Sequence, residues 1–119
     1  MNRFLRYVEL NLSELCNYTC DFCPRGHGYE NQNLHMSLNT ADIICEQIEA
    51  LGVPVRVQLA GRGEPTLCKN FGPIADRLLA LRDRVQGLEI EMNTNGKWVD
   101  KYLPLIERFN DVVYNVYPE

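Results

Sequence analysis

The sequence predicts an α/β fold in which βα units build a parallel sheet. Two observations lead to this class: strand-like and helix-like hydrophobic patterns alternate along all 119 residues, and unusual polar loops follow the strand-like segments. Strands separated by helices of roughly 10–15 residues are typical of βαβ units with right-handed crossovers. At about 150 residues per domain, residues 1–119 are expected to form a single domain.

The expected elements follow one another in the order β-loop-α-β-α-β-α-β. Alternating apolar and polar residues mark the strands, and apolar residues three and four apart mark the helices. A structureless loop above about 12–15 residues is uncommon without a function, so the long first loop is expected to be functional. In chain order we expect a strand over 7–12, a loop over 13–36, a helix over 39–51, a strand over 55–60, a helix over 73–85, a strand over 88–92, a helix over 99–109 and a strand over 112–117.

Capping residues and prolines set the expected helix ends. Asn39 or Thr40 is suited to cap the first helix, and Gly52 suits the left-handed residue that follows it. Pro73 fits the first turn of the second helix. Pro104 should break or restart the third helix, because proline lacks the amide hydrogen.

Three polar loops are expected to meet at one edge of the sheet. They are the long loop, the turn 61–65 and the turn 93–96, and each follows a predicted strand. Ligands of open parallel sheets bind beyond the carboxyl ends of the strands. The last, apolar strand would leave an exposed edge, which promotes aggregation. We therefore expect another chain, or a missing C-terminal part, to cover that edge.

Composition excludes several classes of protein. With 45% hydrophobic and 24% charged residues the chain is globular and not disordered. No apolar run approaches the roughly 20 residues of a membrane helix, and the N-terminus lacks a signal-peptide core, so a cytoplasmic protein without a membrane partner is expected. Sixteen acidic against 12 basic residues give a net charge of −4, which argues against a nucleic-acid partner.

Cysteines form the chemical centre of the sequence. Three of the five crowd into the first loop as Cys16-x3-Cys20-x2-Cys23. Thiolates are soft ligands that suit an iron–sulfur cluster or zinc. Three thiolates leave one iron of a cubane cluster open, whereas His27 would complete a closed Cys3His zinc site. Both kinds of metal site are thus open from the residues alone.

The cysteine spacing, with Phe22 at the aromatic position, resembles the C-x3-C-x-φ-C signature of radical S-adenosylmethionine (SAM) enzymes. The segment Gly61–Pro65 looks like the Gly-x-Gly-Glu-Pro form of their Gly-Gly-Glu motif, and Thr94–Gly96 is also common there. The resemblance covers the whole chain. It implies a partial TIM barrel, truncated to about four strands and three helices.

The resemblance also implies an activity and its cofactors. Cys16, Cys20 and Cys23 would ligate a [4Fe–4S] cluster that cleaves SAM reductively, and the resulting 5′-deoxyadenosyl radical would abstract hydrogen from an unknown small-molecule or peptide substrate. The electron donor would be a flavodoxin or ferredoxin. Contacts with SAM are assigned to the ring of Phe22 near the adenine, to Gly61, Gly63 and Glu64 at the methionine amino group, and to Asn95 and Asn115 at the ribose or carboxylate.

Two alternative functions remain at this point. The chain could be a non-catalytic iron–sulfur or SAM-binding fragment that needs a partner to complete the barrel, or a zinc-stabilised Cys3His binding module. The remaining cysteines, Cys45 and Cys68, are expected to be buried apolar side chains. The pair Glu89 and Glu91 is expected to face solvent. The sequence assigns no role to Arg25 or Arg62.

Overall fold

The expected alternation of strands and helices is confirmed. The structure, a computed structural model, describes residues 6–13, 35–60, 63–96 and 99–115. Its elements in chain order are β1 (Arg6–Asn11), α1 (Leu38–Leu51), β2 (Val55–Ala60), the 3-10 turn η2 (Pro65–Leu67), α2 (Phe71–Arg84), β3 (Glu89–Thr94), the 3-10 turn η3 (Val99–Tyr102), α3 (Leu103–Ile106) and β4 (Asp111–Tyr114).

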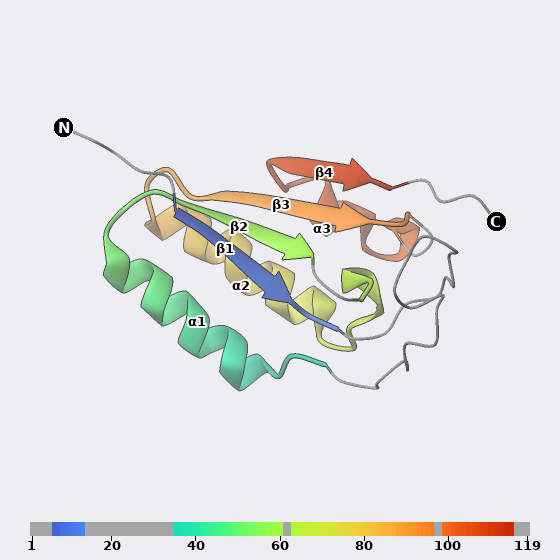
Figure 1. Ribbon diagram of the computed structural model, residues 1–119, viewed down its shortest axis with the longest axis horizontal. Coiled ribbons are helices and arrows are strands. Elements are labelled where there is room, and N and C mark those ends of the chain that lie inside the picture. Colours follow the sequence, from blue (N-terminus) through green and yellow to red (C-terminus); the bar gives the residue numbers. More distant parts are fainter. Residues whose placement is uncertain (1–5, 14–34, 61–62, 97–98, 116–119) are drawn as a thin grey trace.

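The four strands form one parallel sheet in the order β1-β2-β3-β4. Each crossover therefore leads to the adjacent strand in the same direction. Right-handed crossovers that all step the same way place their helices on one face of the sheet, and Figure 1 shows α1 and α2 together on one side. All carboxyl ends of the strands lie at the same edge. This is the arrangement of a barrel wall and not of a doubly wound sheet.

The core lies between this face and the helices. Every second residue of the central strands is buried there, including Val57 and Leu59 of β2 and Ile90 and Met92 of β3, each 0% exposed. Phe71, at the start of α2, is also 0% exposed and packs near the rings of Tyr102 and Phe109. Alternation with a period of two thus directs one face of each strand into the core.

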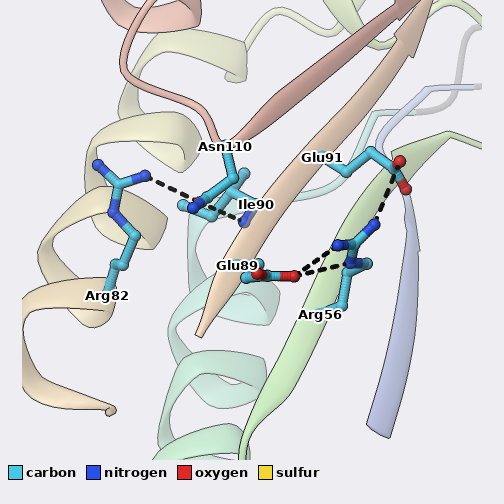
Figure 2. A network of polar contacts seen from close by, with 6 residues as sticks. All are labelled: Arg56, Arg82, Glu89, Ile90, Glu91 and Asn110. Atoms are coloured by element: carbon cyan, nitrogen blue, oxygen red, sulfur yellow. Dashed lines mark hydrogen bonds and ion pairs between the residues drawn. The ribbon is translucent and has the colours of Figure 1, made fainter. Parts of the chain in front are cut away.

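The opposite face of the sheet is polar, and no described helix covers it. Figure 2 shows Arg56 of β2 reaching Glu89 and Glu91 of β3 on this face. Its Nη2 lies 2.6 Å from the Glu89 carboxylate and its Nη1 lies 3.6 Å from that of Glu91. The expectation that both acids face solvent is therefore wrong for Glu91, whose side chain is only 14% exposed. A cross-strand ion pair shields it.

A second polar contact joins β4 to the rest of the sheet. Asn110, just before β4, accepts hydrogen bonds with its side-chain oxygen from the backbone N–H of Ile90 and from Arg82 of α2, both at 2.9 Å (Figure 2). Its own N–H donates to the carbonyl of Ile90 at 2.9 Å. Asn110 thus provides hydrogen-bond partners for both the N–H and the carbonyl of Ile90 in β3, at a position before β4 begins.

The structure corrects several element ends. Ser37, not Asn39 or Thr40, caps α1, because its hydroxyl accepts the N–H of Thr40 at 3.1 Å. Strand β3 continues through Thr94, two residues further than expected, since Asn93 and Thr94 pair with β4.

The expected roles of one glycine and two prolines at helix ends are confirmed. Gly52 is left-handed with φ 68°. Helix α2 begins two residues earlier than expected, with Pro73 in its first turn, and Pro104 restarts the third helical segment as the short α3. Among the described residues, no helix is both long and apolar enough to cross a membrane.

The core predicts a contrast between two isoleucines. Ile90→Ala removes a side chain that is 0% exposed, and we expect it to lower the free energy of unfolding by roughly 2–5 kcal/mol. Ile43→Ala removes the same atoms from a residue that is 46% exposed and should change it by less than about 1 kcal/mol. Urea unfolding followed by circular dichroism measures both. Equal losses would contradict this placement of the core.

Candidate functional site

The predicted site residues that the structure describes lie at the carboxyl edge of the sheet. Gly63 and Glu64 follow β2, Asn95 follows β3 and Asn115 follows β4. Asn115 donates its N–H to the carbonyl of Thr94 at 2.8 Å, which continues the β3–β4 ladder past the end of β4. The other candidates lie outside the described residues: Cys16, Cys20, Phe22, Cys23, His27, Gly61 and Arg62.

Glu64 is the centre of this edge. Its side chain is 4% exposed, and four donors reach its carboxylate. Oε2 accepts the N–H of Thr66 at 3.2 Å, the hydroxyl of Thr66 at 2.6 Å and the hydroxyl of Thr94 at 2.7 Å. Oε1 accepts the N–H of Asn95 at 2.7 Å. The carboxylate therefore joins the turn after β2 to the end of β3.

Among the described residues, only neutral donors contact the carboxylate of Glu64. Within residues 6–13, 35–60, 63–96 and 99–115, no Lys, Arg or His pairs with this carboxylate. A buried carboxylate is costly unless hydrogen bonds or a cation compensate for its lost hydration. Among the described residues the site thus holds a carboxylate without a positively charged partner, an environment that favours a cationic ligand.

The turn after β3 is built on Thr94. The hydroxyl of Thr94, a residue 1% exposed, accepts the N–H of Gly96 at 3.1 Å while it donates to Glu64. Gly96 has φ 85°, and an added Cβ would lie 3.3 Å from the ring of Tyr114. The positive φ favours glycine here, and a side chain would also require the Tyr114 ring to shift slightly. The expected Asn-Gly turn is confirmed, although it starts later than the sequence predicted.

The two ends of the cysteine-bearing segment meet at the same edge. Ser13 and His35 form an isolated antiparallel bridge, and the N–H of Met36 donates to the carbonyl of Leu12 at 2.8 Å. His35 accepts the N–H of Lys69 on its Nδ1 at 3.0 Å. The chain therefore leaves β1 and returns toward α1 at adjoining positions, beside the segment that follows η2.

Cys45 and Cys68 behave as expected for packed thiols. Both are free and buried, at 8% and 1% exposure. Burial is the main cause that raises the pKa of each thiol. Among the described residues, no three His, Cys, Asp or Glu side chains are grouped to hold a metal ion. The expected ligands lie elsewhere, on the segment that the structure does not describe.

The parallel βα sheet, with polar residues gathered at its carboxyl edge, places this chain in the class of partial βα barrels. The chain belongs to the radical SAM superfamily, whose family model matches residues 10–119. It is 32% identical over 92 residues to the GTP 3',8-cyclase of Pasteurella multocida (strain Pm70), which is 76% of this chain and 26% of that protein. The GTP 3',8-cyclase of Stenotrophomonas maltophilia (strain K279a) is 28% identical over 116 residues, 96% of this chain and 34% of that protein.

A further relative is named as a dehydrogenase, whereas the first two are named as cyclases. It is the S-adenosyl-L-methionine-dependent 2-deoxy-scyllo-inosamine dehydrogenase of Niallia circulans, 29% identical over 71 residues, which is 60% of this chain and 28% of that protein. The chain thus spans about a quarter to a third of the length of these curated relatives.

The solved structures confirm the truncated partial barrel. The crystal structure of BtrN in complex with AdoMet and 2-DOIA superimposes with a TM-score of 0.81 at 20% identity, over 100% of this chain and 48% of that chain. BtrN in an open conformation gives a TM-score of 0.72 at 24% identity, over 96% of this chain and 57% of that chain. At these identities the likeness establishes the fold.

Sequence reasoning missed the two threonines at the site. Thr66 was not a candidate, and Thr94 entered as part of the turn and of the Thr94–Gly96 segment common in the family, without a role of its own. The available signal was the carboxylate itself, because a Glu that follows a buried strand needs donors nearby, and Thr66 stands two residues further on. Thr94 is 30 residues away, and only the pairing of β2 with β3 brings it close.

The network predicts that Glu64→Gln destabilises the chain. A glutamine amide carries donors in place of one oxygen, so either orientation turns its NH2 toward groups that also donate. We expect the free energy of unfolding to fall by roughly 1.5–3 kcal/mol. Urea unfolding measures this, with Glu46→Gln on the exposed face of α1 as the matched control. Equal stability of the two variants would show that Glu64 is not held by these donors.

Proposed function

We propose that this chain supplies the SAM-binding and cluster-binding part of a radical SAM enzyme. In this proposal Cys16, Cys20 and Cys23 would hold a [4Fe–4S] cluster that would pass one electron to SAM. The carbon–sulfur bond of SAM would then break to give methionine and a 5′-deoxyadenosyl radical, which would abstract a hydrogen atom from the substrate. Membership of the superfamily supports the class of reaction. The observation that carries the proposal within this chain is the buried carboxylate of Glu64 at the carboxyl edge, with no cation beside it among the described residues.

Glu64 fits the methionine amino group of SAM. An ammonium is a cation with hydrogen-bond donors, and it would compensate the charge for which the described residues provide no cation. Oε2 already accepts three hydrogen bonds, whereas Oε1 accepts one, from Asn95. The free acceptor capacity of the carboxylate therefore lies on Oε1. Gly63, one residue earlier, lets the backbone approach the same group closely.

The remaining SAM contacts are proposals on the same motif residues. Phe22 would pack near the adenine, and Gly61 would join Gly63 at the amino group. Asn95 and Asn115 would bind the ribose or the carboxylate, and both follow strand ends at the edge that carries Glu64. Binding at this edge agrees with the general rule for parallel sheets.

The cysteine motif supplies the donor set for the cluster. Cys16, Cys20 and Cys23 are three thiolates at the spacing of the family signature, and thiolates suit iron–sulfur clusters. Because they provide three ligands, one iron stays open for SAM. Such thiols persist in a reducing compartment, so the proposal includes a cytoplasmic location.

Substrate, reductant and the rest of the barrel complete the proposal. The substrate is a small molecule or peptide, and a flavodoxin or ferredoxin supplies the electron. The chain covers 48% of the BtrN chain that it matches, so further strands, from another chain or a further segment, would close the pocket around the radical. Shielding from water is a general requirement of such chemistry.

Anaerobic reconstitution with iron and sulfide tests the proposal. After reduction with dithionite we expect an EPR signal of a [4Fe–4S]⁺ cluster that shifts when SAM is added. Cys20→Ala should abolish the signal, since it removes a proposed ligand. Cys45→Ala, at a buried thiol outside the motif, should keep it.

Three results would contradict the proposal in different ways. A cluster signal that ignores SAM would leave an iron–sulfur protein without a SAM site. A signal that survives Cys20→Ala would refute the ligand assignment. A tightly bound zinc in the purified protein, lost in His27→Ala, would replace the cluster with a Cys3His site.

A further inference from the structure

We infer that Thr94 is a positioning residue for SAM, and that its hydroxyl sets both the Glu64 carboxylate and the turn that carries Asn95. This inference rests on the proposed function, because it concerns how the same site is held ready. Thr94 itself is 1% exposed and lies on the last position of β3. Its hydroxyl contacts Glu64 and Gly96, so the role that we infer is exerted through these neighbours.

The direction of each hydrogen bond around Thr94 is fixed. The N–H of Gly96 only donates, so the Thr94 oxygen accepts it at 3.1 Å. An ionised carboxylate only accepts, so the single hydroxyl proton of Thr94 goes to Oε2 of Glu64 at 2.7 Å. No alternative arrangement satisfies both neighbours. The Thr94 hydroxyl thus forms a relay: it accepts a hydrogen bond from the turn after β3 and donates one to the carboxylate after β2.

This relay determines which oxygen of Glu64 is left for a ligand. Thr94 and Thr66 together direct three donors to Oε2, which fills its acceptor capacity. Among the described residues, Oε1 accepts the N–H of Asn95 alone, at 2.7 Å. A carboxylate locked in this way presents Oε1 beside Asn95, so a cationic group would meet the charge and the asparagine together.

Loss of the hydroxyl would release both partners at once. Valine has nearly the shape of threonine but neither donates nor accepts. In Thr94→Val, Oε2 loses a donor and the N–H of Gly96 loses its acceptor, so the carboxylate and the turn with Asn95 both gain freedom. Serine keeps the hydroxyl and loses only a methyl group. The pair of variants therefore separates the hydrogen bonds from the packing.

The experiment measures SAM affinity in the reconstituted chain. The SAM-dependent shift of the EPR signal is titrated in the wild-type protein, in Thr94→Val, in Thr94→Ser and in Thr40→Val, which lies on the exposed start of α1. Thr94→Val should raise the Kd for SAM about ten-fold or more, the equivalent of one hydrogen bond to a charged group. Thr94→Ser should stay within about three-fold of wild type, and Thr40→Val should match it. Iron content should be equal in all four proteins.

Hydrogen exchange of the peptide that carries Asn95 and Gly96, measured by mass spectrometry without SAM, provides the second readout. We expect faster exchange in Thr94→Val than in Thr94→Ser. Unchanged affinity in a folded Thr94→Val, or a loss in Thr94→Ser as large as in Thr94→Val, would overturn the inference.

Two further outcomes remain decisive. If Thr94→Val fails to fold, the inference is tested on the wild-type protein. SAM should then slow hydrogen exchange of the Asn95 and Gly96 amides. Unchanged exchange would overturn the inference. A wild-type protein that ignores SAM would refute the proposed function, and the positioning of SAM with it, while the exchange rates without SAM would still show whether the hydroxyl holds the turn.

Discussion

The fixed hand of the βα crossovers, combined with strands laid down in chain order, governs the whole arrangement. Because each right-handed crossover steps to the next strand in the same direction, α1 and α2 gather on one face and the carboxyl ends of all four strands lie at one edge. A reversal of direction at any crossover would have put a helix on the other face and opened a crevice within the sheet. Here the site lies at the carboxyl edge, where Glu64 after β2 contacts Thr94 and Asn95 at the end of β3.

A second consequence is that the carboxylate of Glu64 receives its hydrogen bonds from residues that follow or end two different strands. Glu64 lies in a turn whose own residues supply two of its four donors, both from Thr66. The other two, from Thr94 and Asn95, come from the end of β3. The buried carboxylate is therefore tolerated only while β2 and β3 are paired in register, since a slip by one residue would turn Thr94 to the opposite face. The hydrogen bonds of the site therefore form only when β2 and β3 pair in this register.

Much of the fold could be predicted from the sequence because its signals are local. Hydrophobic periodicity located the strands and helices, and Gly52 and Pro104 marked helix ends through their own backbone preferences. The end of β3 was misplaced because Asn93 and Thr94 have turn-like composition, and only pairing with β4 keeps them extended. Tertiary pairing overrides local preference at such positions.

The sequence identified several residues of the candidate site but not the hydrogen bonds between them. The motif identified Glu64 and Asn95, and the structure shows that one accepts the N–H of the other. That contact could not be inferred from spacing, because the two residues are 31 positions apart and meet only through the strand register. Thr66 escaped notice for a different reason: a threonine is common, and its importance follows only from the burial of the carboxylate beside it.

The same alternation of side chains indicates where the sheet still requires cover. The face opposite the helices carries polar groups that neutralise one another in part, as Arg56 does for Glu89 and Glu91, so it tolerates water. The β4 side differs, because Val113 and Tyr114 are 40% and 53% exposed on a strand for which the structure describes a partner on one side only. Unpaired backbone and exposed apolar surface coincide there, and both are satisfied by one further strand. Within the described residues, this exposed edge is separate from the site, because Glu64 lies on the far side of β3 from β4.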